Sequence, residues 1–235
     1  NNMLPITPTI QKTLPVSAQL GLVCFTTILV FGVFLGTLAA LHQNTVVDYA
    51  IITTCVVFNS IPVFVLAPLL MVVFTLGLHL IPNPLGWGGL FSSKIILPAL
   101  AISLPGLLGL CRQTRASILE VLGQDYIRTA RAKGLTERLL LWRHLLRNAI
   151  TPVLTVSGPL FGDLLLGSFF VEAIFVIPGF GQLGFQSFTG KDYPVILAQT
   201  IIGATIAIML YLLVDLLYGV LDPRVRLGQR AGELR

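Results

Sequence analysis

Long apolar runs separated by short polar turns dominate this chain. A helix needs about 20 consecutive apolar residues to cross the hydrocarbon core of a bilayer. Such runs predict spans at residues 16–41, 49–80, 95–117, 149–175 and 195–221. We therefore expect an all-α, polytopic membrane protein with five spans in this chain.

Proline and glycine make several of these runs irregular. Pro62 and Pro68 interrupt the second run, but no polar turn separates its halves, so we expect one kinked or two-piece span. Gly32 and Gly36 lie four residues apart in the first run and would let another helix approach closely, although membrane helices also tolerate glycine without such a role. Residues 177–194 are expected to form an apolar loop that dips into the membrane or lies at its surface.

Composition and charge agree with the apolar pattern and add the topology. The chain is 55% hydrophobic and only 11% charged, whereas a soluble domain carries about 25% charged residues. Of its 15 lysines and arginines, the sequence places eight between Arg112 and Arg147 and four after Asp222. Positive charge concentrates on the cytoplasmic side of membrane proteins. Loop 118–148 and tail 222–235 are therefore expected to be cytoplasmic, and segment 1–15 extracytoplasmic.

The same observations exclude several other classes. A soluble enzyme is excluded by the composition, and a nucleic-acid-binding face is excluded because the charge is confined to two segments. Cys24, Cys55 and Cys111 stand alone in apolar surroundings, which predicts buried thiols with neither a disulfide framework nor a metal site.

The basic segment within loop 118–148 is the main candidate for function. At 100° per residue, a helix over residues 124–133 places Tyr126, Ile127 and Ala130 on one narrow apolar face. Gly134 then ends this helix as a C-terminal glycine. The other positions of the helix are polar or charged: Asp125, Arg128, Thr129, Arg131 and Lys133.

A second short helix should follow, capped by Thr136. Its apolar face, which we expect to pack on the membrane helices, comprises Leu139, Trp142, Leu145 and Leu146. A central aromatic residue ringed by charge, as at Tyr126, is typical of a protein–protein anchor. The alternative is a basic loop lying on anionic lipid, but two short helices joined by a glycine are not needed for that role.

Five blocks of sequence, in order, resemble the inner-membrane permeases of dipeptide, oligopeptide and nickel importers of the ATP-binding-cassette type. The blocks are DYIRTARAKGL, RHLLRNAITPV, VEAIFVIPGFGQL, KDYPVILAQ and VDLLYGVLDPRVR. The general importer motif has Glu-Ala-Ala where this chain has Arg128, Thr129 and Ala130, and such a replacement is characteristic of the peptide and nickel branch. Members of the family also carry a further span before the region matched here, so the resemblance implies six spans in the full-length protein.

The resemblance implies a multi-subunit machine in the inner membrane. Its partners would be a second homologous permease subunit, two ATPase subunits or domains and an extracytoplasmic solute-binding protein, within membrane lipid and without nucleic acid. The chain has no GxxxxGK[ST] motif to cradle nucleotide phosphates. It is thus expected to bind no cofactor and to catalyse no reaction itself, with ATP and Mg²⁺ bound by the partner ATPases. The residues that the resemblance assigns to ATPase coupling are Asp125, Tyr126, Ile127, Arg128, Ala130, Arg131, Lys133 and Gly134.

Ionisable residues inside predicted spans are functional candidates by default. Asp163 lies in the middle of the fourth span and could line the pathway and contact a cationic group of the solute, or it could be a hydrogen-bonded structural carboxylate. Glu172 lies near the outer end of that span and is expected to support the following loop. Arg112 and Arg115 end the third span, where their side chains can extend to the headgroup boundary.

Two other functions compete with the importer hypothesis. A secondary transporter or channel would work without an ATPase partner, and a membrane scaffold would use the basic segment only to bind lipid. The sequence does not distinguish dipeptides, oligopeptides, glutathione or a nickel chelate as the solute.

Overall fold

The computed structural model describes residues 6–81, 83–140 and 145–221, and its regular elements are all helical. In chain order these elements are α1 (Ile6–Leu41), α2 (Val46–Asn59), α3 (Val63–Met71), the π-helical segment η1 (Val72–Gly77), the short 3₁₀ turn η2 (Ser93–Ile95), α4 (Ile96–Leu122), α5 (Asp125–Ala132), α6 (Glu137–Leu140), α7 (Leu146–Leu165), α8 (Phe169–Ile174), α9 (Phe180–Thr189) and α10 (Tyr193–Leu221). Within these ranges, four helical stretches are long and apolar enough to cross a membrane, or five if α2 and the bent segment after it count as one. The prediction of an all-α membrane protein is confirmed.

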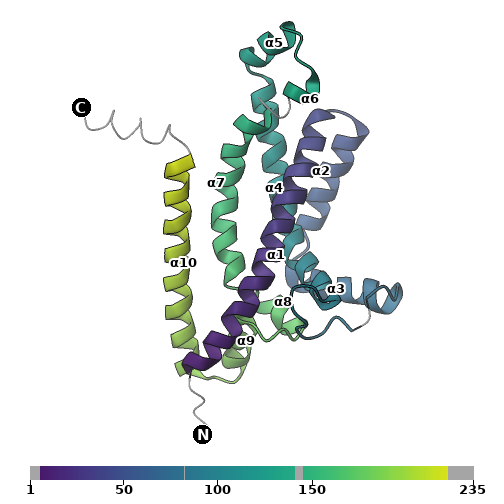
Figure 1. The fold of residues 1–235 in the computed structure, drawn as a ribbon. Helices are drawn as coiled ribbons and strands as arrows, with labels where there is room; N and C mark the ends of the chain where they lie inside the picture. The colour runs from purple at the N-terminus through teal and green to yellow at the C-terminus, as the bar shows by residue number, and fades with distance from the viewer. Residues whose placement is uncertain (1–5, 82, 141–144, 222–235) are drawn as a thin grey trace, which may run out of the picture.

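The long helices α1, α2, α4, α7 and α10 run alongside one another and alternate in direction along the chain (Figure 1). Helices α5 and α6 lie at one end of this bundle, and α8 and α9 lie at the other. The C-terminal ends of α4 and α10 point toward the end that carries α5. The end of α10, at Leu221, is therefore on the same side as the basic segment. Residues 222–235 lie outside the described part of the chain.

Glycines let α1 pack closely on its neighbours. A Cβ atom on Gly36 would come within 2.5 Å of the carbonyl oxygen of Cys111, and one on Gly32 within 3.1 Å of Cβ of Leu110. Separations below about 3.0 Å essentially never occur for real Cβ atoms. The close helix approach predicted for Gly32 and Gly36 is thus confirmed, and its partner is α4.

The second predicted span is sharply broken. The axis turns by 104° between α2 and the segment formed by α3 and η1, which runs across the bundle (Figure 1). The helix ends at Asn59, and Pro62 follows shortly after; a proline disfavours the helical conformation of the residue before it, so a helix usually ends at or before that residue. Pro68, by contrast, lies inside α3. The break lies within the predicted kinked or two-piece span at 49–80, which is one span only if α2 and the bent segment after it are counted together.

Three other boundaries also differ from the sequence prediction. Helix α1 begins at Ile6, ten residues before the predicted start at Val16, so most of segment 1–15 is helical; residues 1–5 lie outside the described residues. The predicted span 149–175 is split between α7 and α8 at Gly167, whose φ is +84°. The loop predicted at 177–194 contains the ten-residue helix α9.

The apolar core lies between the long helices and continues toward α8. Leu66 of α3, Leu97 of α4 and Phe175 after α8 are fully buried in one cluster with α1. Cys24, Cys55 and Cys111 are buried and carry free thiols. The prediction of buried thiols is confirmed.

Candidate functional site

The basic segment folds as a short helical hairpin that begins directly after α4. Gln124 has an extended backbone, with φ −76° and ψ 145°, and α5 starts at the next residue. Gly134 adopts φ +78°, and its N–H donates to the carbonyl oxygen of Arg131 at 2.9 Å. This left-handed conformation is the one glycine favours at a helix C-terminus. The prediction of a short helix followed by Gly134 is confirmed, and a second helix, α6, follows Thr136. However, Leu146, assigned to that second helix, begins α7.

The inner face of the hairpin has a small apolar core of its own. Ile127, Leu140 and Leu145 are completely buried, and Ala130 is 6% exposed. Side chains at the end of α4 and the turn after α5 complete the cluster: Val121, Leu122 and Leu135. The hairpin is therefore a packed unit attached to the end of α4, and it cannot be regarded as a flexible loop.

The predicted apolar face of the first helix is divided between the hairpin core and the surface. Tyr126, Ile127 and Ala130 were expected to present one apolar surface, but Ile127 and Ala130 pack into the hairpin core. Tyr126 remains 42% exposed, and its hydroxyl oxygen accepts a hydrogen bond from Nδ2 of Asn148 at 3.2 Å. The aromatic ring is thus held against the start of α7 with part of its surface outward.

The outer surface of the hairpin is polar and charged. Helix α5 stands at the tip of the bundle, beyond the ends of α1, α4 and α7 (Figure 1). The four charged residues that were predicted to take part in ATPase coupling are all exposed on α5 or at its C-terminal end: Asp125, Arg128, Arg131 and Lys133. The exposed part of Tyr126 together with these residues is called the α5 tip surface below. It combines one aromatic group with a rim of mostly positive charge.

The second helix differs from its predicted orientation. Leu139 was placed on the apolar face but is 43% exposed, whereas its neighbour Leu140 is completely buried. Leu145 is buried as predicted. Trp142, assigned to the same face, lies outside the described residues.

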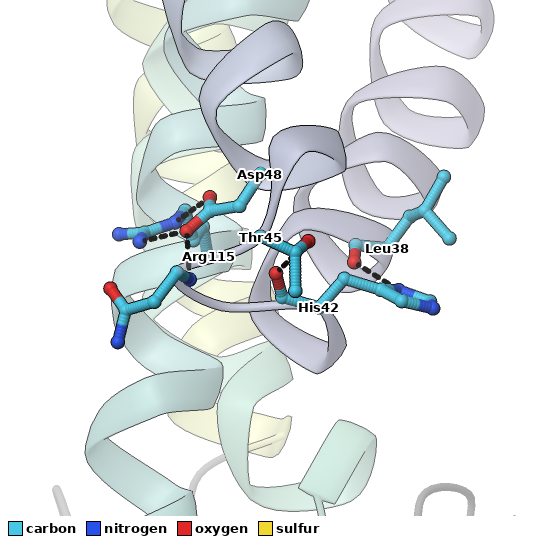
Figure 2. Close-up of polar contacts among 6 residues, drawn as sticks. Leu38, His42, Thr45, Asp48 and Arg115 are labelled. Atoms are coloured by element: carbon cyan, nitrogen blue, oxygen red, sulfur yellow. Dashed lines mark hydrogen bonds and ion pairs between the residues drawn. The ribbon is translucent and has the colours of Figure 1, made fainter.

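An ion pair that the sequence analysis missed ties the α1–α2 turn to α4 near the hairpin. Arg115 Nε and one of its terminal nitrogens each donate to a carboxylate oxygen of Asp48 at 2.7 Å. The backbone N–H of Asn44 donates to the same carboxylate at 3.0 Å, while Thr45 Oγ1 donates to the carbonyl oxygen of His42 at 2.6 Å within the turn (Figure 2). Asp48 is 2% exposed.

Arg115 was expected to extend toward the lipid headgroups, but its guanidinium is instead held by Asp48 in a two-point contact. Two parallel N–H···O bonds fix geometry as well as charge. Because α4 continues directly into α5, this pair joins the turn after α1 to the helix that carries the hairpin.

Glu172 anchors the opposite end of the bundle. Its side chain is completely buried and accepts hydrogen bonds from Ser17 Oγ at 2.7 Å and from the backbone N–H of Gln182 at 3.0 Å. Ser17 Oγ in turn accepts from the N–H of Phe180 at 2.7 Å. The carboxylate thereby joins α8, α1 and α9, which fits the supporting role expected from the sequence.

Asp163 lies on α7 and faces α10. Its Oδ1 accepts a hydrogen bond from the hydroxyl of Tyr211 at 2.7 Å. The residue also lines a cavity of about 320 Å³ together with residues of α1, α3 and α4. The structure therefore separates Asp163 from the hairpin: the two candidate sites lie in different parts of the bundle. Among the described residues, no group of three or more His, Cys, Asp or Glu side chains is arranged to hold a metal ion.

Comparison with known proteins gives three consistent findings. Residues 32–227 match the family model for the inner membrane component of binding-protein-dependent transport systems. The chain is 42% identical over 223 residues to the dipeptide transport system permease protein DppB of Bacillus subtilis strain 168, covering 94% of this chain and 71% of that protein. It is 41% identical over 217 residues to the oligopeptide transport system permease protein OppB of Escherichia coli K12, covering 92% and 71% respectively.

Among solved structures, the fold is similar to that of the MetNI methionine ABC transporter in an inward-facing conformation. The TM-score is 0.75 at 16% identity, over 93% of this chain and 98% of the other. An amino acid ABC transporter crystallised with histidines gives a TM-score of 0.64 at 20% identity, over 93% and 94%. At such identities the likeness concerns the fold alone.

Proposed function

Because this chain belongs to the inner membrane components of binding-protein-dependent transport systems, we propose that it is the permease subunit of an ATP-driven importer for dipeptides or oligopeptides. The substrate class follows the dipeptide and oligopeptide permeases to which the sequence is similar. Such a subunit forms half of a translocation pathway and carries out no catalysis of its own.

The partners of this subunit follow from the same role. A second, homologous permease subunit would complete the pathway, two ATPase subunits or domains would bind ATP and Mg²⁺, and an extracytoplasmic binding protein would deliver the peptide. The exposed apolar side chains along α10 would meet either lipid or the second permease subunit, because few of them are covered within this chain.

The observation that supports ATPase coupling is the packed hairpin at the tip of the bundle. The α5 tip surface offers an aromatic group with a charged rim, which is the usual composition of an anchor for another protein. Ile127, Ala130 and Gly134 contribute indirectly, since they hold α5 in place instead of touching the partner. A force on α5 would pass into α4 and, through Asp48 and Arg115, into the turn between α1 and α2.

The proposed topology places the hairpin in the cytoplasm and the loop around Phe91 outside. Phe91 is fully exposed, and the three native cysteines are buried. In intact cells, a membrane-impermeant thiol reagent should label Phe91→Cys and should label Gln124→Cys only after permeabilisation. The cysteine-containing wild-type chain is the control for background labelling. The reverse pattern would contradict the proposed orientation.

The function itself is tested by transport in reconstituted vesicles. The permease pair, its ATPases and the binding protein should import a labelled peptide only when ATP is present on the ATPase side. A complex with an ATPase unable to hydrolyse ATP serves as the matched control. Equal import with and without ATP hydrolysis would instead support a secondary transporter or channel.

A further inference from the structure

The cavity beside Asp163 has an uneven chemical lining. Its volume is about 320 Å³, at the lower end of the range for ligand pockets, so it can take one residue or one end of a peptide. Most of its wall is apolar, including Leu20, Ile102, Pro105 and Leu160. Asp163 is the charged residue among those that line it.

The carboxylate of Asp163 is oriented but not neutralised by its neighbours. Tyr211 donates to Oδ1 at 2.7 Å. Within the described part of the chain, Asp163 forms no ion pair. A carboxylate in an apolar, membrane-spanning setting is costly unless a cation or hydrogen-bond donors compensate it. One hydrogen bond from Tyr211 leaves most of its acceptor capacity for another group.

Helix α10 is held close to α7 at this position. A Cβ atom on Gly162 would lie 2.9 Å from Cε1 of Tyr211, so the absence of a side chain there allows the Tyr211 ring to approach α7 closely. The ring thus brings its hydroxyl to Asp163 from a neighbouring helix. Asp163 is recognisable in the sequence as a charge within a predicted span, whereas Tyr211, 48 residues later, carries no such signal.

We propose that Asp163 and Tyr211 form a subsite for a protonated amine of the transported peptide. This inference rests on the proposed function, since it assigns a substrate group to the pathway of a peptide permease. An alkylammonium group has three N–H donors, which suit the remaining lone pairs of the carboxylate and the hydroxyl oxygen of Tyr211. The apolar wall would contact the adjoining carbon atoms. Both the N-terminal ammonium and a lysine side chain provide this chemistry.

A purely structural role predicts a different result from one substitution. If Asp163 only links α7 to α10, Asp163→Asn should preserve function, because the amide oxygen of Asn also accepts a hydrogen bond from Tyr211. If Asp163 binds an amine, the same substitution removes the charge and weakens recognition. Asp163→Glu retains the charge, and Tyr211→Phe removes the link while retaining the carboxylate.

The experiment uses the complete reconstituted complex with three labelled peptides of equal length. One has a free N-terminus and norleucine, one is N-acetylated and carries lysine, and one is N-acetylated and carries norleucine. Each is supplied as a preformed complex with saturating binding protein, so that differences in capture by that protein do not enter. Each variant is compared with wild type for the same peptide.

In the wild type, both amine-bearing peptides should be imported faster than the peptide without an amine. Asp163→Asn should reduce import of the amine-bearing peptides by about tenfold, the factor expected for one charge-assisted hydrogen bond, and should leave the third peptide nearly unchanged. Asp163→Glu should retain the preference. Tyr211→Phe should weaken it less than Asp163→Asn does, because the variant loses the hydroxyl oxygen but keeps the carboxylate. If Asp163→Asn slows import of only one of the two amine-bearing peptides, that peptide shows whether the subsite binds the N-terminal ammonium or the lysine side chain.

Two outcomes would overturn the subsite. One is equal import of all three peptides by the wild type, and the other is an equal reduction of all three by Asp163→Asn. If Asp163→Asn does not assemble, the order of import rates of the three peptides in wild type and in Tyr211→Phe still tests the subsite. A wild-type complex that imports no peptide with ATP would refute the proposed function itself, a result distinguishable from uniform import.

Discussion

Replacing Gly134 with valine should abolish peptide-stimulated ATP hydrolysis and import while the transmembrane helices remain assembled. Gly134 has φ +78°, a conformation in which a β-branched residue is strongly disfavoured. A Cβ atom at this position would meet no other atom within 4 Å. The effect of the substitution therefore comes from backbone strain alone, which would displace α6 from α5 and open the apolar core of the hairpin.

Peptide-stimulated ATP hydrolysis by the Gly134→Val complex should be more than tenfold slower than in wild type. A left-handed conformation costs a residue with a Cβ roughly 1–2 kcal/mol, and opening the core around Ile127 adds the exposure of buried apolar side chains. Gly134→Asn is the matched control, because asparagine tolerates positive φ better than other residues with a Cβ. Stimulated hydrolysis and import are measured in vesicles, with subunit association measured by pull-down. Wild-type coupling in the valine variant would show that the hairpin does not transmit the ATPase motion.

The sequence predicts α5 well because its signals are local. Helical periodicity over residues 124–133 and a glycine at the C-terminal position define the helix without reference to the rest of the chain. The direction of its apolar face is not a local property. Ile127 could contact a partner protein or its own chain, and the answer depends on how the turn at Gly134 places Leu140 and Leu145 against it. The pattern predicted an interface but could not tell which molecule supplies the other half.

Contacts between distant residues account for most of what was missed. Asp48 and Arg115 are 67 residues apart, and neither lies in a sequence motif that indicates an ion pair. Arg115 at the end of an apolar run fits an interfacial arginine equally well. The same holds for Tyr211 with Asp163, and for Ser17 with Glu172, whose hydrogen-bond partners are separated by 155 residues.

Breaks in membrane helices also leave only a weak signal in the sequence. The 104° turn before α3 is preceded by only two polar residues, Asn59 and Ser60, in an otherwise apolar stretch. In a soluble protein, a chain reversal is usually marked by polar residues, because loops lie in water. Here proline and glycine mark the breaks, and they indicate a position without indicating an angle.

Glu172→Ala should cause the largest loss of stability of any single substitution at the α8–α9 end of the bundle. The carboxylate is completely buried and accepts from Ser17 Oγ and from the N–H of Gln182. Its removal leaves these two donors buried without an acceptor, at about 1–3 kcal/mol each. It also creates a cavity, because the glycines around it are packed tightly: a Cβ on Gly167 would lie 2.2 Å from Oε1, and one on Gly179 would lie 2.3 Å from Oε2.

We therefore expect Glu172→Ala to lower stability by roughly 3 kcal/mol or more, seen as reduced yield and a lower Tm of the purified complex. Glu172→Gln is the matched control and should be intermediate, since the amide keeps the volume and one acceptor oxygen but turns a donor toward Ser17 or Gln182. Ser17→Ala should cost less than Glu172→Ala, because it removes one link between α1 and α9 and leaves the bond to Gln182 in place. Because α8, which carries Glu172, lies at the opposite end of the bundle from the hairpin (Figure 1), Glu172→Gln complexes that assemble should retain ATPase association. An alanine variant as stable as wild type would show that the carboxylate of Glu172 does not hold α8, α9 and α1 together.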